Sequence, residues 1–180
     1  MTRNGRRLGG FAALCLLSTV LSAAAQPPDA ALMELSFTRV AVWAGEEAAL
    51  PIYLVSESNY HEPFQITLEF SADQLSFQKI QSAYLADRAK WTMGATLKNH
   101  PEKGNRRILQ IDVTPGQATF FPSGAVAHAH FLVAAGSRDG DILLDAALVA
   151  PLSASPVPTP GPAKITVISA LLYGCFFYMH

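Results

Sequence analysis

The stretch that decides the fold is PFQITLEFSADQLSF, residues 63–77 of a 180-residue chain. In it, Phe64, Ile66, Leu68 and Phe70 alternate with polar side chains. This period of two predicts a half-buried β-strand, because successive side chains leave a pleated strand on opposite faces. The run SAD then favours a turn, and LSF resumes the apolar pattern. We therefore expect the chain to turn here and the next strand to add to the same core.

Further segments of this kind recur along the chain between turn signals rich in Gly, Pro, Asp and Ser. They cover residues 35–42, 49–55, 108–113, 126–133, 142–149 and 165–168. Many short strands with little helix predict an all-β protein built as an antiparallel β-sandwich.

Two of these strands carry an irregularity. In residues 35–42 the apolar parity changes near Thr38 and Arg39, which predicts a bulge or a crossing between sheets. In residues 49–55, Pro51 has no N–H to donate to a ladder, so we expect an edge strand or a bulge at that position.

Composition limits the function. The chain has 13 Lys and Arg against 14 Asp and Glu, so it lacks the basic surplus that nucleic-acid binding requires. Half of its residues are apolar, which is enough for a core that needs no disulfide or metal.

The N-terminus has the features of an export signal. Three arginines precede an apolar run over residues 11–21, and the triplet AAA at 23–25 fits a cleavage site. We expect a signal peptide over residues 1–25, a disordered leader over 26–31, and a secreted, periplasmic or cell-envelope location. Cleavage removes Cys15 and leaves Cys175 alone, so the mature chain can form no internal disulfide.

The C-terminal part contains a Pro-rich insertion over residues 151–162, inside a domain that we expect to span 32–169. Residues 165–179 carry no charge but are too few to span a bilayer. We expect residues 165–168 to form the last strand. The apolar tail over 170–180 would then pack on the domain, on a partner or on a membrane.

No motif for catalysis is present, since the sequence lacks G-x-S-x-G and holds Cys175 in an apolar run. His128 and His130 form H-x-H on an expected strand, where both would face solvent opposite the core. The DGD run at 139–141 lacks the further acids of a calcium loop. We predict a protein that is not an enzyme and uses no metal or cofactor.

The least regular stretch is residues 81–107, which holds six of the 13 Lys and Arg residues. We interpret it as a solvated loop with one helical turn near residues 83–89 and with Trp91 folded onto the core. The alternative is a binding edge, because loops often carry function. The candidate binding-surface residues are Tyr60, Tyr84, Trp91, His128 and His130.

Four segments in order resemble the cohesin family. They are GEEAALPIYL at 45–54, LEFSADQL at 68–75, PSGAVAHAHF at 122–131 and AKITV at 163–167. These are similar to the family's G-D-x-V-x-V-P-V-x-L, Y-D-P-x-x-L, G-x-L-A-x-I-x-F and G-x-I-x-V signatures. The Tyr-Asp pair of the second signature is replaced by Phe70 and Ser71 here.

This resemblance covers about residues 32–169 and implies a jelly-roll sandwich of about nine strands. It implies a non-catalytic module for protein–protein recognition, with a dockerin-type module or another secreted or envelope protein as partner, in polysaccharide-degrading assemblies. The alternative is a carbohydrate-binding module that binds polysaccharide directly. Sugar binding would require a planar strip of exposed aromatic side chains, whereas protein recognition requires a broad face with an apolar centre and a polar rim.

Overall fold

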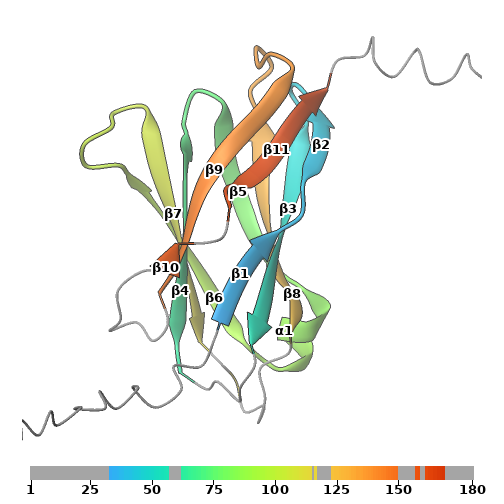
Figure 1. The fold of residues 1–180 in the computed structure, drawn as a ribbon, viewed down its shortest axis with the longest axis vertical. Helices are drawn as coiled ribbons and strands as arrows, with labels where there is room; N and C mark the ends of the chain where they lie inside the picture. The colour runs from blue at the N-terminus through green and yellow to red at the C-terminus, as the bar shows by residue number, and fades with distance from the viewer. Residues whose placement is uncertain are drawn as a thin grey trace, which may run out of the picture.

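A computed structural model describes residues 33–56, 62–114, 116, 123–149, 157–158 and 161–168. These residues form strands and one short helix (Figure 1). In chain order the elements are β1 (Met33–Phe37), β2 (Val40–Trp43), β3 (Glu47–Ser56), β4 (Phe64–Ser71), β5 (Leu75–Ser82), α1 (Tyr84–Arg88), β6 (Thr92–Asn99), β7 (Arg106–Thr114), β8 (Gly124–Val133), β9 (Gly140–Val149), β10 (Val157–Pro158) and β11 (Ala163–Ile168).

The strands form two sheets packed face to face (Figure 1). One sheet has the order β1-β3-β8-β5, and the other has the order β2-β11-β9-β4-β7-β6 with β10 paired to β9. Within the described residues every pairing is antiparallel except that of β11 with β2. The predicted all-β sandwich with little helix is confirmed.

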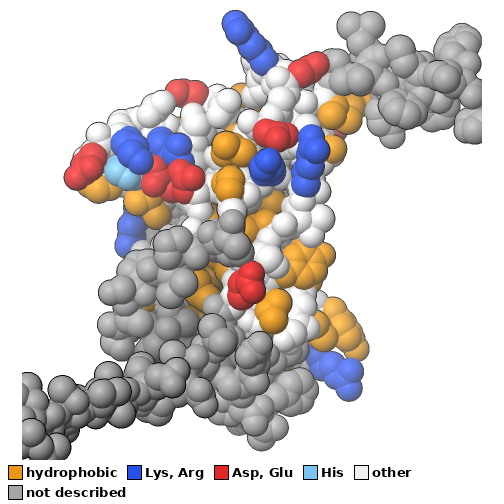
Figure 2. Space-filling view, in the orientation of Figure 1, with side chains coloured by type: hydrophobic (Ala, Val, Ile, Leu, Met, Phe, Trp, Pro, Cys, Tyr) orange, Lys and Arg blue, Asp and Glu red, His pale blue; other side chains and the backbone are white. Residues whose placement is uncertain are grey.

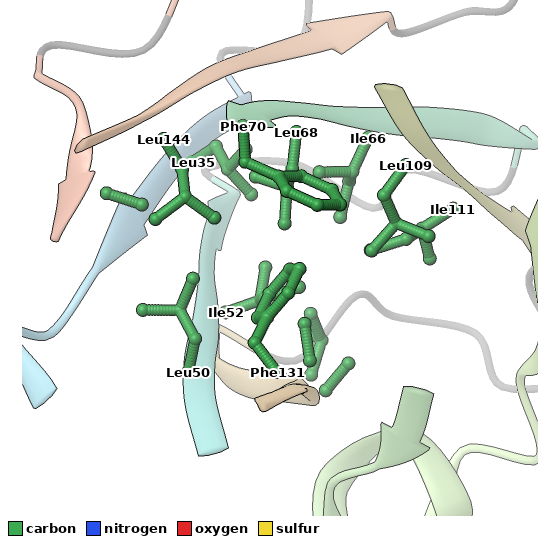
Figure 3. Packing of buried hydrophobic residues seen from close by; sticks show 14 of the residues in the cluster. Leu35, Leu50, Ile52, Ile66, Leu68, Phe70, Leu109, Ile111, Phe131 and Leu144 are labelled. Carbon is green, nitrogen blue, oxygen red and sulfur yellow. The ribbon is translucent and has the colours of Figure 1, made fainter. Parts of the chain in front are cut away.

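The core is made by the inward faces of both sheets (Figure 3). Phe64, Ile66, Leu68 and Phe70 of β4 are fully buried, and the residues between them lie on the outer face. Full burial of each such side chain contributes roughly 1.5–3 kcal/mol. Residues 64–71 of the stretch PFQITLEFSADQLSF therefore lie inside the larger sheet, between β9 and β7.

The chain crosses between the sheets near Thr38, where the apolar parity changes. Phe37 at the end of β1 pairs with Ile52 in the smaller sheet, whereas Val40 at the start of β2 pairs with Ile165 in the larger one. The predicted crossing near Thr38 is therefore present. The turn after β4 makes the same kind of crossing, because β5 lies in the smaller sheet.

The edge position predicted for the strand around Pro51 is wrong, because β3 lies inside the smaller sheet between β1 and β8. The predicted irregularity is present, since the register of β3 on β8 shifts between Ile52 and Tyr53. Pro51 also lies just past the last β1 pair, Phe37 with Ile52. A missing N–H is tolerated where a ladder ends or bulges.

The prediction that residues 81–107 form a solvated loop is wrong in part. The helical turn is present as α1, but β6 follows it as an eight-residue strand paired with β7 throughout. The inward positions of β6 are Met93, Ala95 and Leu97, and Gly94 lies between the first two on the outer face. Small and flexible residues give a weak strand signal, so the pairing with β7 decides this element.

Several predictions fall on residues that lie outside the described part of the chain. They are the signal peptide over 1–25, the leader over 26–31, most of the insertion over 151–162 and the tail over 170–180. In the described residues, no helix is both long enough and apolar enough to cross a membrane. The expected last strand is present as β11, which pairs with β9 on one side and β2 on the other.

Candidate functional site

The larger sheet presents an outer face on β9, β4, β7 and β6, called here the β4 face. The ladder registers align its side chains in three rows across the strands. These rows are Ala147–Thr67–Gln110–Thr96, Asp145–Glu69–Ile108–Lys98 and Val149–Gln65–Asp112–Gly94. The first row is uncharged, and charged residues lie on both sides of it.

Side-chain hydrogen bonds tie neighbouring strands of the β4 face together. Gln65 Nε2 donates to Asp112 Oδ1 at 2.6 Å, and Gln110 Nε2 donates to the same oxygen at 3.2 Å. Lys98 Nζ donates to Gln110 Oε1 at 2.7 Å. This chain of contacts runs from β4 to β6 and holds the polar side chains in fixed positions.

A cluster of charged residues lies at one end of the β4 face, where β6 turns into β7. Glu69 contacts Arg106, accepts a bond from Lys103 Nζ at 3.0 Å, and lies 3.7 Å from His100 Nε2. Arg106 Nη2 also donates to Asp145 Oδ2 at 2.7 Å. Figure 2 shows acidic, basic and histidine side chains gathered over this hairpin. We call these five residues the Glu69 cluster.

The cluster keeps Glu69 ionised. Partial burial by itself would raise the pKa of Glu69, but the hydrogen bond from Lys103 and the charge of Arg106 outweigh it, so the pKa lies below its ordinary value. The backbone carbonyl of Glu69 also accepts a bond from Arg106 Nη2 at 3.1 Å. Arg106 is thus anchored to β4 as well as to the Asp145 side chain on β9.

A shallow hollow opens on the β4 face beside this cluster. Its lining residues are Thr67, Glu69, Ile108, Asp145, Ala146 and Ala147. Apolar atoms form part of the lining, and two carboxylates stand at one side. The hollow can accept one partner side chain, which would find apolar contact and a charged rim together.

The outer face of the smaller sheet holds His128 and His130, opposite the core as predicted, but the His130 side chain is only 12% exposed and so is not the solvent-facing residue that was expected. Their buried neighbours Ala127, Ala129 and Phe131 point into the core, so both histidines leave β8 on the opposite side. His130 Nδ1 lies 2.6 Å from Glu47 Oε1. Within the described residues, no group of three or more His, Cys, Asp or Glu side chains is placed to hold a metal ion.

The other candidate surface residues lie apart from one another. Tyr84 of α1 is 72% exposed, whereas Trp91 is only 6% exposed and packs edge-on against Phe64 at 6.2 Å between ring centroids. Burial removes Trp91 from the candidate surface and agrees with the interpretation that it folds onto the core. Tyr60 lies outside the described residues.

The exposed aromatic side chains do not form a strip in the described part of the chain. Trp43 is 41% exposed and adjoins a turn whose Gly45 bonds Val133, at the end of β8. Tyr84 follows Ala83, which bonds Val126 near the start of β8. Seven residue steps along a strand separate these attachment points, or about 23 Å.

Sequence reasoning missed the Glu69 cluster. In the sequence, Glu69 is one of the polar side chains that alternate with Phe64 to Phe70, and nothing marks it further because its partners are 31 or more positions away. Only the pairing of β4 with β7 and β9 brings Arg106 and Asp145 beside it. The excess of basic residues in 81–107 is the one local signal of this cluster.

The likeness of this chain to known proteins lies in its fold. No model of a protein family matches the chain, and no curated protein matches it. Solved structures do match, among them the sixth cohesin of Acetivibrio cellulolyticus scaffoldin B in complex with the Cel5 dockerin. It is 13% identical, with 76% of this chain and 99% of that one covered and a TM-score of 0.56.

Two further matches agree. A type I cohesin–dockerin complex from Clostridium thermocellum gives 11% identity, coverage of 76% and 99%, and a TM-score of 0.54. The seventh type I cohesin of ScaB from Pseudobacteroides cellulosolvens gives 13% identity, coverage of 77% and 93%, and a TM-score of 0.54. At this identity the likeness concerns the fold, and this chain has the β-sandwich fold of the cohesin domains.

Proposed function

We propose that this chain is an exported, non-catalytic recognition module that binds a dockerin-like partner module through the β4 face. The observation that carries the proposal is the cohesin fold together with this face. Two of the matching structures were solved in complex with dockerins, so this sandwich is a known scaffold for protein recognition. Fold likeness supports the class of partner, and the β4 face supplies the site.

The β4 face has the features that a protein interface requires. Its central row, Ala147–Thr67–Gln110–Thr96, is uncharged. The adjoining hollow offers the apolar side chains of Ile108 and Ala147, and hydrogen-bonded polar groups lie around it. Apolar area in the hollow favours association, and the polar groups around it set the orientation of the partner. The side chains are already held by their own bonds, so little conformational entropy is lost on binding.

Charge on the β4 face is balanced. Acidic Glu69, Asp112 and Asp145 stand beside basic Lys98, Lys103 and Arg106. A partner therefore need not be strongly charged, and its affinity should change little with salt at physiological ionic strength. Direct binding of polysaccharide has less support, because the exposed Trp43 and Tyr84 lie near opposite ends of β8.

Affinity capture with point variants tests the proposal. The mature chain is used as bait against the secreted and envelope proteins of its source, beside a panel of insoluble polysaccharides. Thr67→Arg places a long cation at the centre of the β4 face, and Gln81→Arg places the same group on the exposed outer side of β5. Both positions point outward, so both variants should fold.

The expected result is capture of a protein carrying a dockerin-type module, lost with Thr67→Arg and retained with Gln81→Arg. Retention on polysaccharide without a protein partner would favour the carbohydrate-binding alternative. Capture that survives Thr67→Arg but fails with Gln81→Arg would move the site to the smaller sheet. Amino-terminal sequencing of the exported protein tests the export part, with Gln26 as the expected first residue.

A further inference from the structure

The free side of β6 differs from the other sheet edges in the described part of the chain. The edge strands there are β1 and β5 in the smaller sheet and β2 and β6 in the larger one. β6 has eight residues and pairs with β7 at every one of them without a shift of register. In an antiparallel ladder about half of the residues point N–H and C=O away from the neighbour, so about four residues of β6 present free backbone groups.

Edge strands normally carry a feature that blocks further pairing: short length, a charge, a proline or a bulge. β1 and β2 are short, with five and four residues. β5 has an irregular register between Phe77 and Lys79, and Lys79 adds a charge. β6 has none of these features over its first six residues, TMGATL, and its one charge is Lys98 near the end.

Both faces of β6 are accessible. Every residue of the strand except Met93 is exposed, including Ala95 and Leu97. These two lie on the inward side, since their partners Ile111 and Leu109 on β7 are fully buried. Leu97 is a large apolar side chain left 37% exposed. A strand added here would therefore gain apolar contacts as well as backbone hydrogen bonds.

The sequence of β6 is complementary to itself in one antiparallel register. With Ala95 opposite Ala95 of a second copy, Met93 lies opposite Leu97 and Thr92 lies opposite Lys98. Inward residues then face inward residues on both chains, as pairing within one sheet requires. The two lysines stand at opposite ends of the paired segment, so like charges do not meet.

We propose that β6 pairs antiparallel with β6 of a second copy of this chain, about a two-fold axis at Ala95. The larger sheets of the two copies then become one continuous sheet, which covers Leu97 and closes the open edge. The two β4 faces come to lie in the same sheet as a paired surface. This inference does not depend on the proposed function, because the edge and its register exist whatever the β4 face binds.

Sedimentation velocity over a concentration series tests the pairing on the full chain. We expect a monomer–dimer equilibrium that Ala95→Lys shifts to monomer, because two lysines would face each other at the axis. Ala41→Lys is the matched control, since it adds the same charge at an exposed position of β2, the other edge of the same sheet. Thermal melts of both variants verify that they are folded.

Cysteine cross-linking tests the register, in a background with Cys15 and Cys175 replaced by serine. Residues directly opposite in antiparallel strands have Cα atoms about 4.5–5.5 Å apart, within reach of a disulfide. Ala95→Cys should therefore form an intermolecular disulfide. Thr96→Cys should not form one. In this register the two Thr96 residues are offset by two positions, so their Cα atoms lie about 8 Å apart.

Three results would overturn the proposal. The first is a monomer at every concentration together with no disulfide in Ala95→Cys. The second is a dimer that Ala95→Lys leaves intact, which would place the contact elsewhere. The third is a chain that stays monomeric and captures a partner protein, where Ala95→Lys abolishes the capture. In that case the edge of β6 pairs with a strand of the partner and not with a second copy.

Discussion

The rings of Phe70 and Phe131 meet edge to face across the sandwich, with centroids 5.0 Å apart and ring planes 73° apart (Figure 3). Phe70 is the last inward residue of β4, and Phe131 belongs to β8 in the other sheet. Phe77 of β5 contacts the same ring of Phe131 at 5.9 Å between centroids. The turn between β4 and β5 thus places two aromatic rings against one and joins the sheets at that point.

Leu68→Ala should destabilise the domain by roughly 2–5 kcal/mol, through lost burial and the cavity that remains. Leu68 is fully buried at the centre of β4, with β9 and β7 on its two sides. Urea denaturation followed by tryptophan fluorescence measures the change. Thr67→Ala, at the adjacent outward position, is the control and should cost much less. Equal midpoints for the two variants would contradict the assignment of inner and outer faces.

Glu69→Gln should reduce stability at neutral pH and have less effect in acid. The pKa of Glu69 is lowered in the folded chain from an ordinary value of 4.5, so the unfolded chain binds this proton more readily. The stabilisation is therefore complete above the ordinary value and is lost as the pH falls through the lowered pKa.

Melting temperatures of wild type and Glu69→Gln, compared between about pH 3 and pH 7, measure this effect. The difference in melting temperature between wild type and Glu69→Gln should be constant above the ordinary pKa of Glu69 and should become smaller in acid. A gap of constant size across the whole series would show that the charge of Glu69 contributes nothing, and that the variant acts through packing alone.

Zinc should not raise the melting temperature of this domain. His128 and His130 share the outer face of β8, but the Nδ1 atom of His130 already lies 2.6 Å from Glu47. A stabilising metal would have to replace this contact and find further ligands. His128→Ala should melt like wild type with zinc or with a chelator present. A zinc-dependent rise in wild type that is absent from His128→Ala would establish a metal site.

Truncation should separate β11 from the apolar tail that follows it. A chain ending at Ser169 should remain folded, because it keeps β11 and its pairings with β9 and β2. A chain ending at Pro162 should unfold, since it loses the buried Ala163, Ile165 and Val167 and separates β2 from the larger sheet. Circular dichroism melts of both truncations and the full chain provide the comparison. Identical melts for all three would contradict the place of β11 in the core.

The amino-acid sequence by itself determined which side chains face the core along β4, β7 and β8. Alternation is a local property of a pleated strand, so Phe64 to Phe70 could be assigned without knowledge of any partner strand. The parity change near Thr38 was readable for the same reason and predicted a bulge or a crossing between sheets, and the pairing of β1 and β2 with different sheets makes it a crossing.

The tertiary structure decided what depends on which strands become neighbours. β6 has little apolar alternation and forms because β7 pairs with it, while Pro51 is accepted inside a sheet because a bulge and the end of β1 meet there. The Glu69 cluster joins β4, β9 and the β6–β7 hairpin, and Arg106 reaches Asp145 only across these ladders. Strand order and register are long-range properties, so no single stretch of sequence contains them.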